Sequence, residues 1–277
     1  MTPDQTKAAR DLLAFYAEAG VQDLVGETPV NHFADPVTSA SAEPAELRAE
    51  IHDEISTPPQ SEPRPPPRAL PPQSAPLAPE AAAMAAREAA GRARSLDELR
   101  DILAGFHGCA LRQTAKQLVF ADGNPEARVM FVGEAPGREE DLAGLPFVGP
   151  SGKLLDLMLN AIGLTRASAY IANVIPWRPP GNRTPTPQET AICLPFIARQ
   201  IALVDPDVLV CMGGPASQTL LNLKDGIRKT RGRWLTYHTG ARDIRALPTF
   251  HPAYLLRSPL EKRNAWRDML EIKKALG

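Results

Sequence analysis

The sequence predicts an α/β fold in which helices cover both faces of a mainly parallel sheet. Two observations indicate this class. Short apolar runs, typical of buried parallel strands, recur between residues 128 and 250. Longer segments with apolar residues at helical spacing lie between these runs, and such alternation favours right-handed crossovers and parallel strands.

Four short apolar segments are expected to form the strands. They are residues 128–133, 169–174, 207–212 and 246–250. Pro248 has no backbone N–H, so it favours an edge or irregular position for the last strand. The intervening helices are expected at residues 152–163, 187–204 and 214–223.

The first 90 residues divide into two segments of different composition. Residues 1–25 carry apolar side chains in a helical pattern, and we expect this helical segment to pack on the main domain or to bind a partner protein. Residues 26–90 are acidic and then rich in proline, so we expect a disordered linker. The main domain is expected over residues 91–277, where Ser95 and Glu98 predict a capping box at the first helix.

Acidic and basic residues are concentrated in different parts of the chain, although the net charge is only −1. Residues 1–56 contain eleven acidic and three basic side chains, whereas residues 223–277 contain thirteen basic and five acidic ones. This predicts a basic face, typical of nucleic-acid binding, although a solvated basic helix is the plainer alternative. No apolar stretch is long enough for a membrane span and no signal sequence is evident, so we expect a cytoplasmic protein.

Polar residues follow the predicted strands where α/β sheets place their chemistry. Gly133-Glu134-Ala135 follows the first strand, and His251 follows the last. A carboxylate and an imidazole are thereby expected at one edge of the sheet. Either motif alone is also compatible with an ordinary turn or a structural histidine.

Further motifs lie between these two strand ends: Gly144-Leu145-Pro146-Phe147-Val148-Gly149-Pro150-Ser151-Gly152, Tyr170-Ile171-Ala172-Asn173-Val174 and Pro176-Trp177-Arg178-Pro179-Pro180-Gly181-Asn182-Arg183. In order and spacing, the chain from about Cys109 onward resembles the uracil-DNA glycosylase superfamily, most closely family 4, which usually carries an iron–sulfur cluster. The resemblance implies a three-layer α/β/α sandwich with a mainly parallel four-stranded sheet. It also implies base excision repair by hydrolysis of the N-glycosidic bond of uracil in DNA, which leaves an abasic site.

The resemblance implies that two residues carry the reaction. His251 would donate a hydrogen bond to uracil O2 as negative charge grows there, and Glu134 would orient water and stabilise the cationic sugar. The aspartate of the commonest uracil glycosylases would fall at Ala135, so Glu134 must replace it. Glu140 and Asp141 are the alternatives, either as a second acid or as a wall against the methyl group of thymine.

Further residues are implied to bind the flipped base and the DNA. Phe147 would stack on uracil, and Asn173 would pair with O4 and N3–H, a pattern that cytosine reverses. The expected uracil-binding residues are Gly133, Ala135, Phe147, Asn173 and Glu140. The expected DNA-contacting residues are Ser151, Arg183, Leu255, Leu256 and Arg257. The two leucines are either wedges into the base stack or the apolar start of a helix.

The cysteines do not supply the ligands of a family 4 cluster. Cys109 and Cys193 match the second and fourth ligand positions, whereas Phe106 and Trp177 stand at the first and third. Four thiolates are needed and neither aromatic side chain coordinates iron, so we expect no cluster, no other metal and no cofactor. The aromatic pair would fill the vacated volume, and Cys211 is expected in the core.

Uracil-containing DNA is the expected partner, no membrane association is expected, and the chain is expected to act as a monomer. Two alternatives are a DNA-binding module without catalysis and a variant that traps its product covalently on a histidine. The presence of Glu134, Asn173 and His251 argues against the first. Ala135 in place of glutamine, and the lack of a histidine-bearing basic insertion, argue against the second. A nucleotide enzyme is disfavoured because the glycine spacing matches no phosphate-binding loop.

Overall fold

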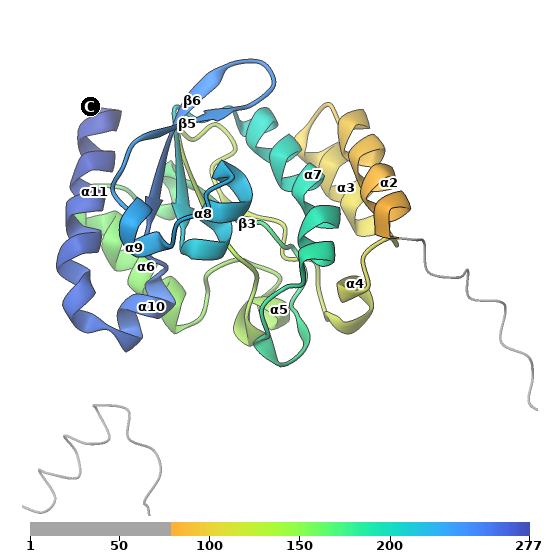
Figure 1. The fold of residues 1–277 in the computed structure, drawn as a ribbon, viewed down its shortest axis with the longest axis horizontal. Helices are drawn as coiled ribbons and strands as arrows, with labels where there is room; N and C mark the ends of the chain where they lie inside the picture. Colours follow the sequence, from red (N-terminus) through yellow and green to blue (C-terminus); the bar gives the residue numbers. More distant parts are fainter. Residues whose placement is uncertain (1–78) are drawn as a thin grey trace, which may run out of the picture. The chain divides into compact units, whose positions relative to one another are not determined.

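Among the described residues, 79–277, six strands form one mixed sheet (Figure 1). The strands are β1 (Asp122–Gly123), β2 (Val129–Gly133), β3 (Tyr170–Asn173), β4 (Val208–Met212), β5 (Leu235–His238) and β6 (Asp243–Thr249), in the order β1-β3-β2-β4-β6-β5. The four inner strands are parallel, whereas β1 and β5 pair antiparallel at the edges. The predicted parallel strands are therefore confirmed, but the predicted total of four is wrong because it lacks both edge strands.

The coordinates are a computed structural model, and residues 79–277 belong to one unit of the chain. The predicted helical segment 1–25 and most of the predicted linker 26–90 lie outside the described residues. Among the described helices, none is long and apolar enough to cross a membrane.

Alternate residues of the inner strands belong to two separate apolar cores. Met130 and Val132 of β2 pack on one face, while Val129 and Phe131 pack on the other. Side chains of a strand point alternately to opposite faces, so a strand that is buried on both sides needs an unbroken apolar run. This explains why the sequence shows runs here and no apolar–polar alternation.

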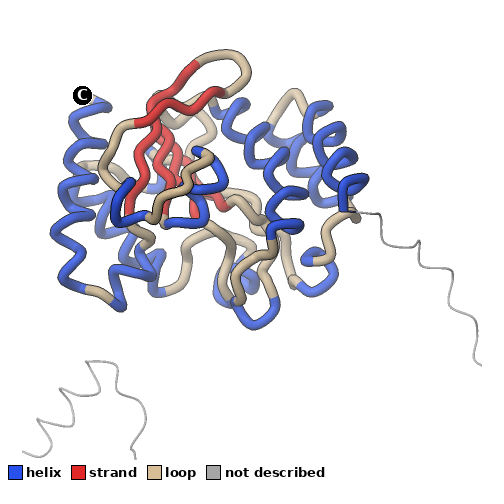
Figure 2. Tube along the Cα trace, in the orientation of Figure 1, coloured by secondary structure: helices blue, strands red, loops and turns tan. Residues whose placement is uncertain are grey.

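Helices cover both faces, which confirms the three-layer sandwich (Figure 2). The first core includes residues of α2 (Pro79–Arg92), α3 (Leu96–Gly105), α7 (Pro187–Val204) and α8 (Gly214–Leu221). The second includes residues of α6 (Pro150–Ala161) and α11 (Lys262–Leu276). The short helices are α4 (Leu111–Thr114), α5 (Arg138–Ala143), α9 (Ile227–Thr230) and α10 (Pro252–Arg257), with 3₁₀ turns η1 (Arg166–Ser168), η2 (Pro180–Asn182) and η3 (Pro259–Glu261).

Helix α2 corrects the predicted boundary between linker and folded domain at residue 90. It begins at Pro79 and places Ala82, Ala86 and Ala89 in the first core, so the boundary falls inside a packed helix. Small alanine side chains allow α2 to approach α7 closely. The predicted capping box of the next helix is confirmed in one half, because the Glu98 amide donates to the N-cap Ser95 Oγ at 3.2 Å. The Glu98 carboxylate accepts from the amide of Arg94, one residue before the N-cap, and not from the Ser95 amide as a capping box requires.

Strand β6 lies inside the sheet, so the predicted edge position for the proline-containing strand is wrong. Pro248 pairs in register with Cys211 of β4, whereas pairing with β5 ends at Ala246. The Pro248 carbonyl accepts from the Gly232 amide, and the next carbonyl, of Thr249, accepts from Gly213 beyond the end of β4. The backbone of Pro248 therefore faces away from β4, where the pairing with β5 has already ended, and the missing N–H disrupts no ladder.

Candidate active site

The carboxyl ends of the parallel strands meet at the lower edge of Figure 1, between α5 and α10. A cavity of about 560 Å³ opens there. It brings together residues that follow three different strands: Glu134 after β2, Gly213 after β4 and His251 after β6, with Asn173 at the end of β3. The predicted residues that line it are Glu134, Ala135, Glu140, Phe147, Ser151, Asn173, Arg183, His251 and Arg257.

Gly133 keeps open the space between Asn173 and Phe147. A Cβ at this position would lie 2.5 Å from Asn173 Oδ1 and 2.6 Å from Phe147 Cζ, which is closer than real side chains allow. Gly133 does not line the cavity itself, and its predicted role in uracil binding therefore becomes one of leaving room for the two residues beside it.

Phe147 adopts a backbone conformation that is unusual for its residue type. Its φ is +55°, in the left-handed region, and its side chain is buried. The Phe147 and His251 ring centroids are 5.4 Å apart with a tilt of 30°. The predicted stacking residue and the predicted hydrogen-bond donor are thus adjacent, although they lie far apart in the sequence.

Asn173 presents an unused acceptor to this site. Its Oδ1 is the buried side-chain polar atom that has no hydrogen-bond partner among residues 79–277. A buried acceptor without a partner costs about 1–3 kcal/mol, and such groups call for an explanation. Because the amide lies at the cavity, a ligand that donates an N–H would satisfy it.

His251 is a neutral hydrogen-bond donor at the start of α10. Its Nδ1 accepts a hydrogen bond from the Ala253 amide at 3.1 Å, so the ring proton lies on Nε2. Burial, with a smaller contribution from the charge of Arg257, lowers the pKa of His251 to about 4. The imidazole is therefore uncharged at neutral pH and donates through Nε2 alone.

Glu134 is half-buried directly after β2. Burial raises the pKa of Glu134 above its ordinary value. A second cavity, of about 40 Å³, lies against Glu134 and is also lined by Thr184 and Thr190. It has room for a water molecule and polar groups to hold one, so the carboxylate can contact both the main cavity and a water beside it.

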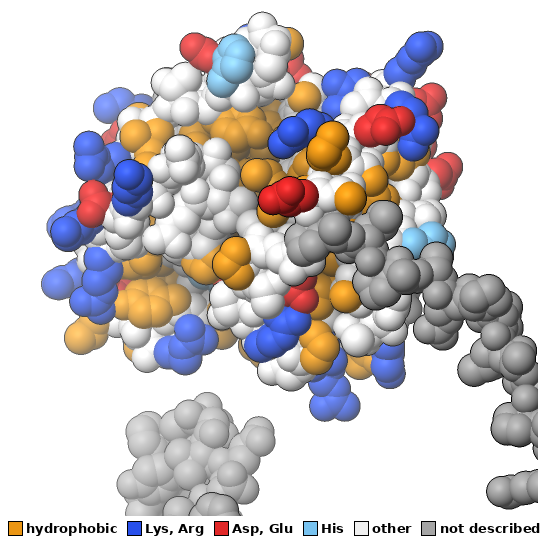
Figure 3. Space-filling view, turned by 45° about the vertical axis from the view of Figure 1, so that its right-hand side comes forward, with side chains coloured by type: hydrophobic (Ala, Val, Ile, Leu, Met, Phe, Trp, Pro, Cys, Tyr) orange, Lys and Arg blue, Asp and Glu red, His pale blue; other side chains and the backbone are white. Residues whose placement is uncertain are grey.

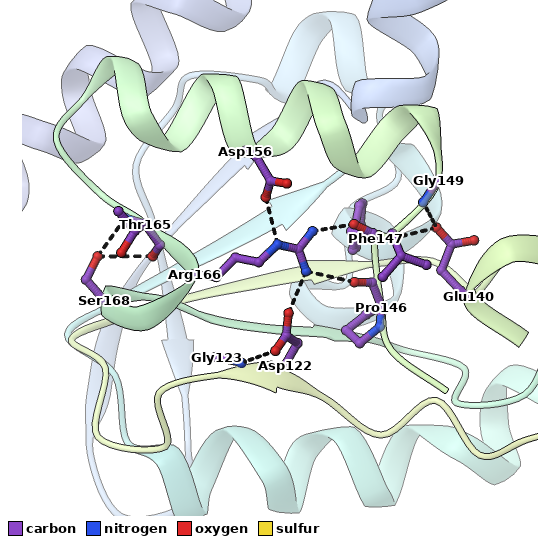
Figure 4. Close-up of polar contacts among 11 residues, drawn as sticks. Asp122, Gly123, Glu140, Pro146, Phe147, Gly149, Asp156, Thr165, Arg166 and Ser168 are labelled. Atoms are coloured by element: carbon purple, nitrogen blue, oxygen red, sulfur yellow. Dashed lines mark hydrogen bonds and ion pairs between the residues drawn. The ribbon is translucent and has the colours of Figure 1, made fainter. Parts of the chain in front are cut away.

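Glu140 and Asp141, the predicted alternative acids, are engaged in holding loops. Glu140 Oε1 accepts from the amides of Val148 and Gly149 at 3.1 and 3.0 Å (Figure 4). Glu140 Oε2 accepts from the Gly137 amide at 3.0 Å. Asp141 Oδ1 accepts from the amides of residues 116 and 117 at 2.8 and 3.3 Å. Both carboxylates are committed to backbone donors, so Glu134 is the one of the three predicted acids that is free for chemistry at this cavity.

The two leucines predicted to contact DNA differ in their surroundings. Leu255 is 1% exposed and packs with Phe250 and Ala265, whereas Leu256 is 43% exposed. Leu255 therefore belongs to the core, and its predicted contact with DNA is wrong. Leu256 stays the candidate wedge. Arg183, at the cavity rim, is bound by both carboxylate oxygens of Glu189, at 2.8 and 2.6 Å.

The residues at the family 4 ligand positions do not fit a cluster held by four cysteines. Cys109 and Cys193 are buried with their sulfur atoms 3.9 Å apart, but Phe106 and Trp177 belong to the same apolar core. The Phe106 ring packs edge-to-face on Phe196, with centroids 5.0 Å apart. Among residues 79–277, no three His, Cys, Asp or Glu side chains converge as a metal site. Cys211 is buried in β4, as predicted.

Gly213 is a site residue that the sequence analysis missed. Its φ of +92° favours glycine, and a Cβ there would lie 3.1 Å from His251 Cβ. The available signal was the Gly213-Gly214-Pro215 segment after the third predicted strand, at the same edge of the sheet as the other two motifs.

The comparison with known families settles the relationship of this chain. The family model of the Uracil DNA glycosylase superfamily matches residues 120–270. The chain belongs to this superfamily. The match spans all of the residues that bring Glu134, Phe147, Asn173 and His251 to one cavity.

Known relatives confirm the resemblance to family 4. The chain is 38% identical over 187 residues to the type-4 uracil-DNA glycosylase of Archaeoglobus fulgidus. This match covers 66% of this chain and 94% of the relative. The corresponding protein of Saccharolobus solfataricus is 37% identical over 187 residues, 66% of this chain and 87% of the relative. That of Thermotoga maritima is 44% identical over 151 residues, 54% of this chain and 77% of the relative.

Proposed function

We propose that this protein is a uracil-DNA glycosylase of base excision repair, a hydrolase that cleaves the bond between uracil and deoxyribose in DNA. One observation carries the proposal beyond the family relationship. The buried acceptor Asn173 Oδ1 has no partner among residues 79–277 and lies at the same cavity as the Phe147 ring and a neutral His251. This set of groups matches a flat base that donates one N–H and carries an oxygen at its edge.

Recognition of uracil follows from the amide of Asn173. Its Oδ1 would accept N3–H of uracil, and its Nδ2 would donate to O4. Cytosine has an acceptor at N3 and a donor at N4, so it would leave buried polar groups unpaired, and such mismatches discriminate strongly. The Phe147 ring would stack on the base after the nucleotide has left the helix.

The chemistry uses two groups of opposite function. His251 Nε2–H would stabilise the negative charge that develops on uracil O2, and a neutral donor suffices because the leaving group is an anion. Glu134 would orient the attacking water and stabilise the positive charge on the sugar. Burial raises the pKa of Glu134, which makes the carboxylate a stronger base toward the proton of that water.

The surface around the cavity fits a DNA backbone. Lys and Arg side chains are frequent along the left edge and the lower rim of Figure 3. The cavity lies at the carboxyl ends of the parallel strands, which are at the lower edge of Figure 1. Arg257 and Ser151 line the cavity itself, and Leu256 is exposed on the same short helix as Arg257. These residues would hold phosphates and fill the space of the flipped base.

The proposal includes catalysis without a cofactor. The expected absence of a cluster rests on the residues at the four family 4 ligand positions, of which two are cysteines and two are aromatic residues. The cytoplasmic location, the monomeric state and a protein partner for the N-terminal segment stay predictions from the sequence.

A labelled oligonucleotide with a single uracil tests the function. Incubation with the protein, followed by alkali, should break the strand at the uracil. Glu134→Ala should lower the rate by roughly 10²-fold or more and His251→Ala by about 10²–10³-fold. Glu126→Ala, which removes an exposed carboxylate outside the cavity, is the matched control and should keep the wild-type rate.

Two other outcomes would replace the proposal. Tight binding of the uracil oligonucleotide without strand breakage would indicate a non-catalytic binding module. An adduct that survives denaturing electrophoresis would indicate covalent trapping of the product.

A further inference from the structure

Arg166 is the centre of a charged network next to the base-binding wall (Figure 4). Its Nε donates to Asp156 Oδ1 at 2.7 Å, and its Nη1 donates to Asp122 Oδ2 at 2.6 Å. Asp122 belongs to β1 and Asp156 to α6, so the guanidinium is fixed from two elements. About a quarter of the Arg166 side chain is exposed, which limits the screening of these bonds by water.

The remaining donors of Arg166 reach the backbone of the cavity wall. Nη1 donates to the Pro146 carbonyl at 3.1 Å, and Nη2 donates to the Phe147 carbonyl. Phe147 has the left-handed φ of +55°, which non-glycine residues rarely adopt. Gly152 makes room for this conformation, because a Cβ there would collide with the Phe147 carbonyl oxygen.

A carboxylate holds the same backbone from the other side. Glu140 Oε1 accepts from the amides of Val148 and Gly149 at 3.1 and 3.0 Å. Residues 146–149 are therefore fixed by a cation at their carbonyl groups and an anion at their N–H groups. We call this arrangement of Arg166 and Glu140 the two-sided clamp.

We propose that Arg166 is a positioning residue for base excision, which acts by holding the Phe147 backbone in its left-handed conformation. The inference rests on the proposed function and deepens it. Arg166 does not line the cavity, so it acts through Phe147, whose ring lies 5.4 Å from the His251 ring. Without the clamp, the backbone at residue 147 would relax and move the ring away from the base.

Arginine is needed at this position for its geometry as well as its charge. A guanidinium presents five N–H donors in a planar fork, whereas an ammonium is a point charge with three. Arg166→Lys keeps the positive charge between Asp122 and Asp156, but lysine cannot also reach both carbonyl groups. The variant therefore tests the clamp while it spares the electrostatic balance.

Arg242→Lys is the matched control. Arg242 Nε donates to Asp205 Oδ1 at 2.7 Å, and Nη2 donates to the carbonyls of Asp205 and Pro206 at 2.9 and 3.2 Å. Asp205 also has a positive φ, of +48°. The control thus removes the same kind of clamp, on the same kind of backbone, at a place that does not line the cavity.

Two measurements separate positioning from general stability, both at a temperature where circular dichroism shows each variant folded. In hydrogen–deuterium exchange, the Val148 and Gly149 amides should exchange faster in Arg166→Lys and at the wild-type rate in Arg242→Lys. In single-turnover excision at saturating protein, Arg166→Lys should be slower by roughly 10- to 100-fold, as expected for a displaced contact. The factor should be equal for single- and double-stranded substrates, with unchanged binding of uracil-free DNA.

The outcomes decide the inference in every case. Unchanged exchange of the Val148 and Gly149 amides, or faster exchange with unchanged excision, would overturn it. If Arg166→Lys does not fold, Asp156→Asn, which weakens only one anchor of the guanidinium, must show the same two effects at smaller size. If the wild type excises no uracil, the proposed function fails, and the exchange measurement still decides whether the clamp holds Phe147.

Discussion

His251 should remain neutral down to about pH 4, and this makes a measurable contribution to stability. An exposed or unfolded histidine takes up its proton near pH 6.5, whereas the folded His251, with a pKa of about 4, does so only there, because burial disfavours the charged ring. Between these values the unfolded state binds more protons than the folded state. The stabilisation is therefore complete above pH 6.5 and is lost as the pH falls toward 4.

The size of the effect follows from the two pKa values. The full difference corresponds to about 3 kcal/mol, of which about 2 kcal/mol should be lost between pH 7 and pH 5. His251→Gln removes the titration but keeps a side-chain oxygen that can accept from the Ala253 amide. Urea unfolding at both pH values should show that the wild type loses about 2 kcal/mol more than the variant.

Other titrating groups, including Glu134, are common to both proteins and cancel in this comparison. An NMR titration of the imidazole gives the pKa directly. The reasoning would be refuted if the two proteins lost stability in parallel, or if the His251 ring titrated near pH 6.5.

Three further predictions concern packing, backbone and ligands. Leu255→Ala should lower the free energy of unfolding by about 2–5 kcal/mol because it empties a core position. Leu256→Ala should leave stability nearly unchanged and slow excision more on duplex than on single-stranded DNA. Denaturant unfolding and the ratio of the two excision rates would show the opposite pattern if the assignment of the two leucines were reversed. Gly213→Ala should cost about 1–3 kcal/mol of stability and reduce excision, since it strains a φ of +92° and displaces His251; equal melting temperatures and rates would contradict this. The purified protein should contain no stoichiometric iron and show no visible cluster absorption, and iron analysis together with a visible spectrum would reveal a cluster if one formed.

The inner sheet and the main catalytic candidates follow from the amino-acid sequence alone. Continuous apolar runs identify strands that are buried on both faces, and parallel strands bring their carboxyl ends to one edge. For this reason Glu134, Asn173 and His251 could be expected together from their places at the ends of predicted strands. The presence of Phe106 and Trp177 at two of the four family 4 ligand positions could also be read from the sequence, because the resemblance to that family supplied the positions.

The use of the remaining residues depends on tertiary packing. Leu255 and Leu256 are adjacent and chemically identical, and the phase of α10 against the core alone separates a buried side chain from an exposed one. The edge strands β1 and β5 are short and depend on pairing with β3 and β6, so their own residues carry little signal.

The same holds for Arg166, whose partners lie in separate parts of the chain. Arg166 binds a carboxylate 44 residues away and another 10 residues away, and it clamps a carbonyl 20 residues upstream. Local patterns specify which segments form helices and strands because those choices depend on neighbouring residues. The role of a charged side chain depends on which distant groups the fold brings within hydrogen-bond distance, and that is decided only when the chain has packed.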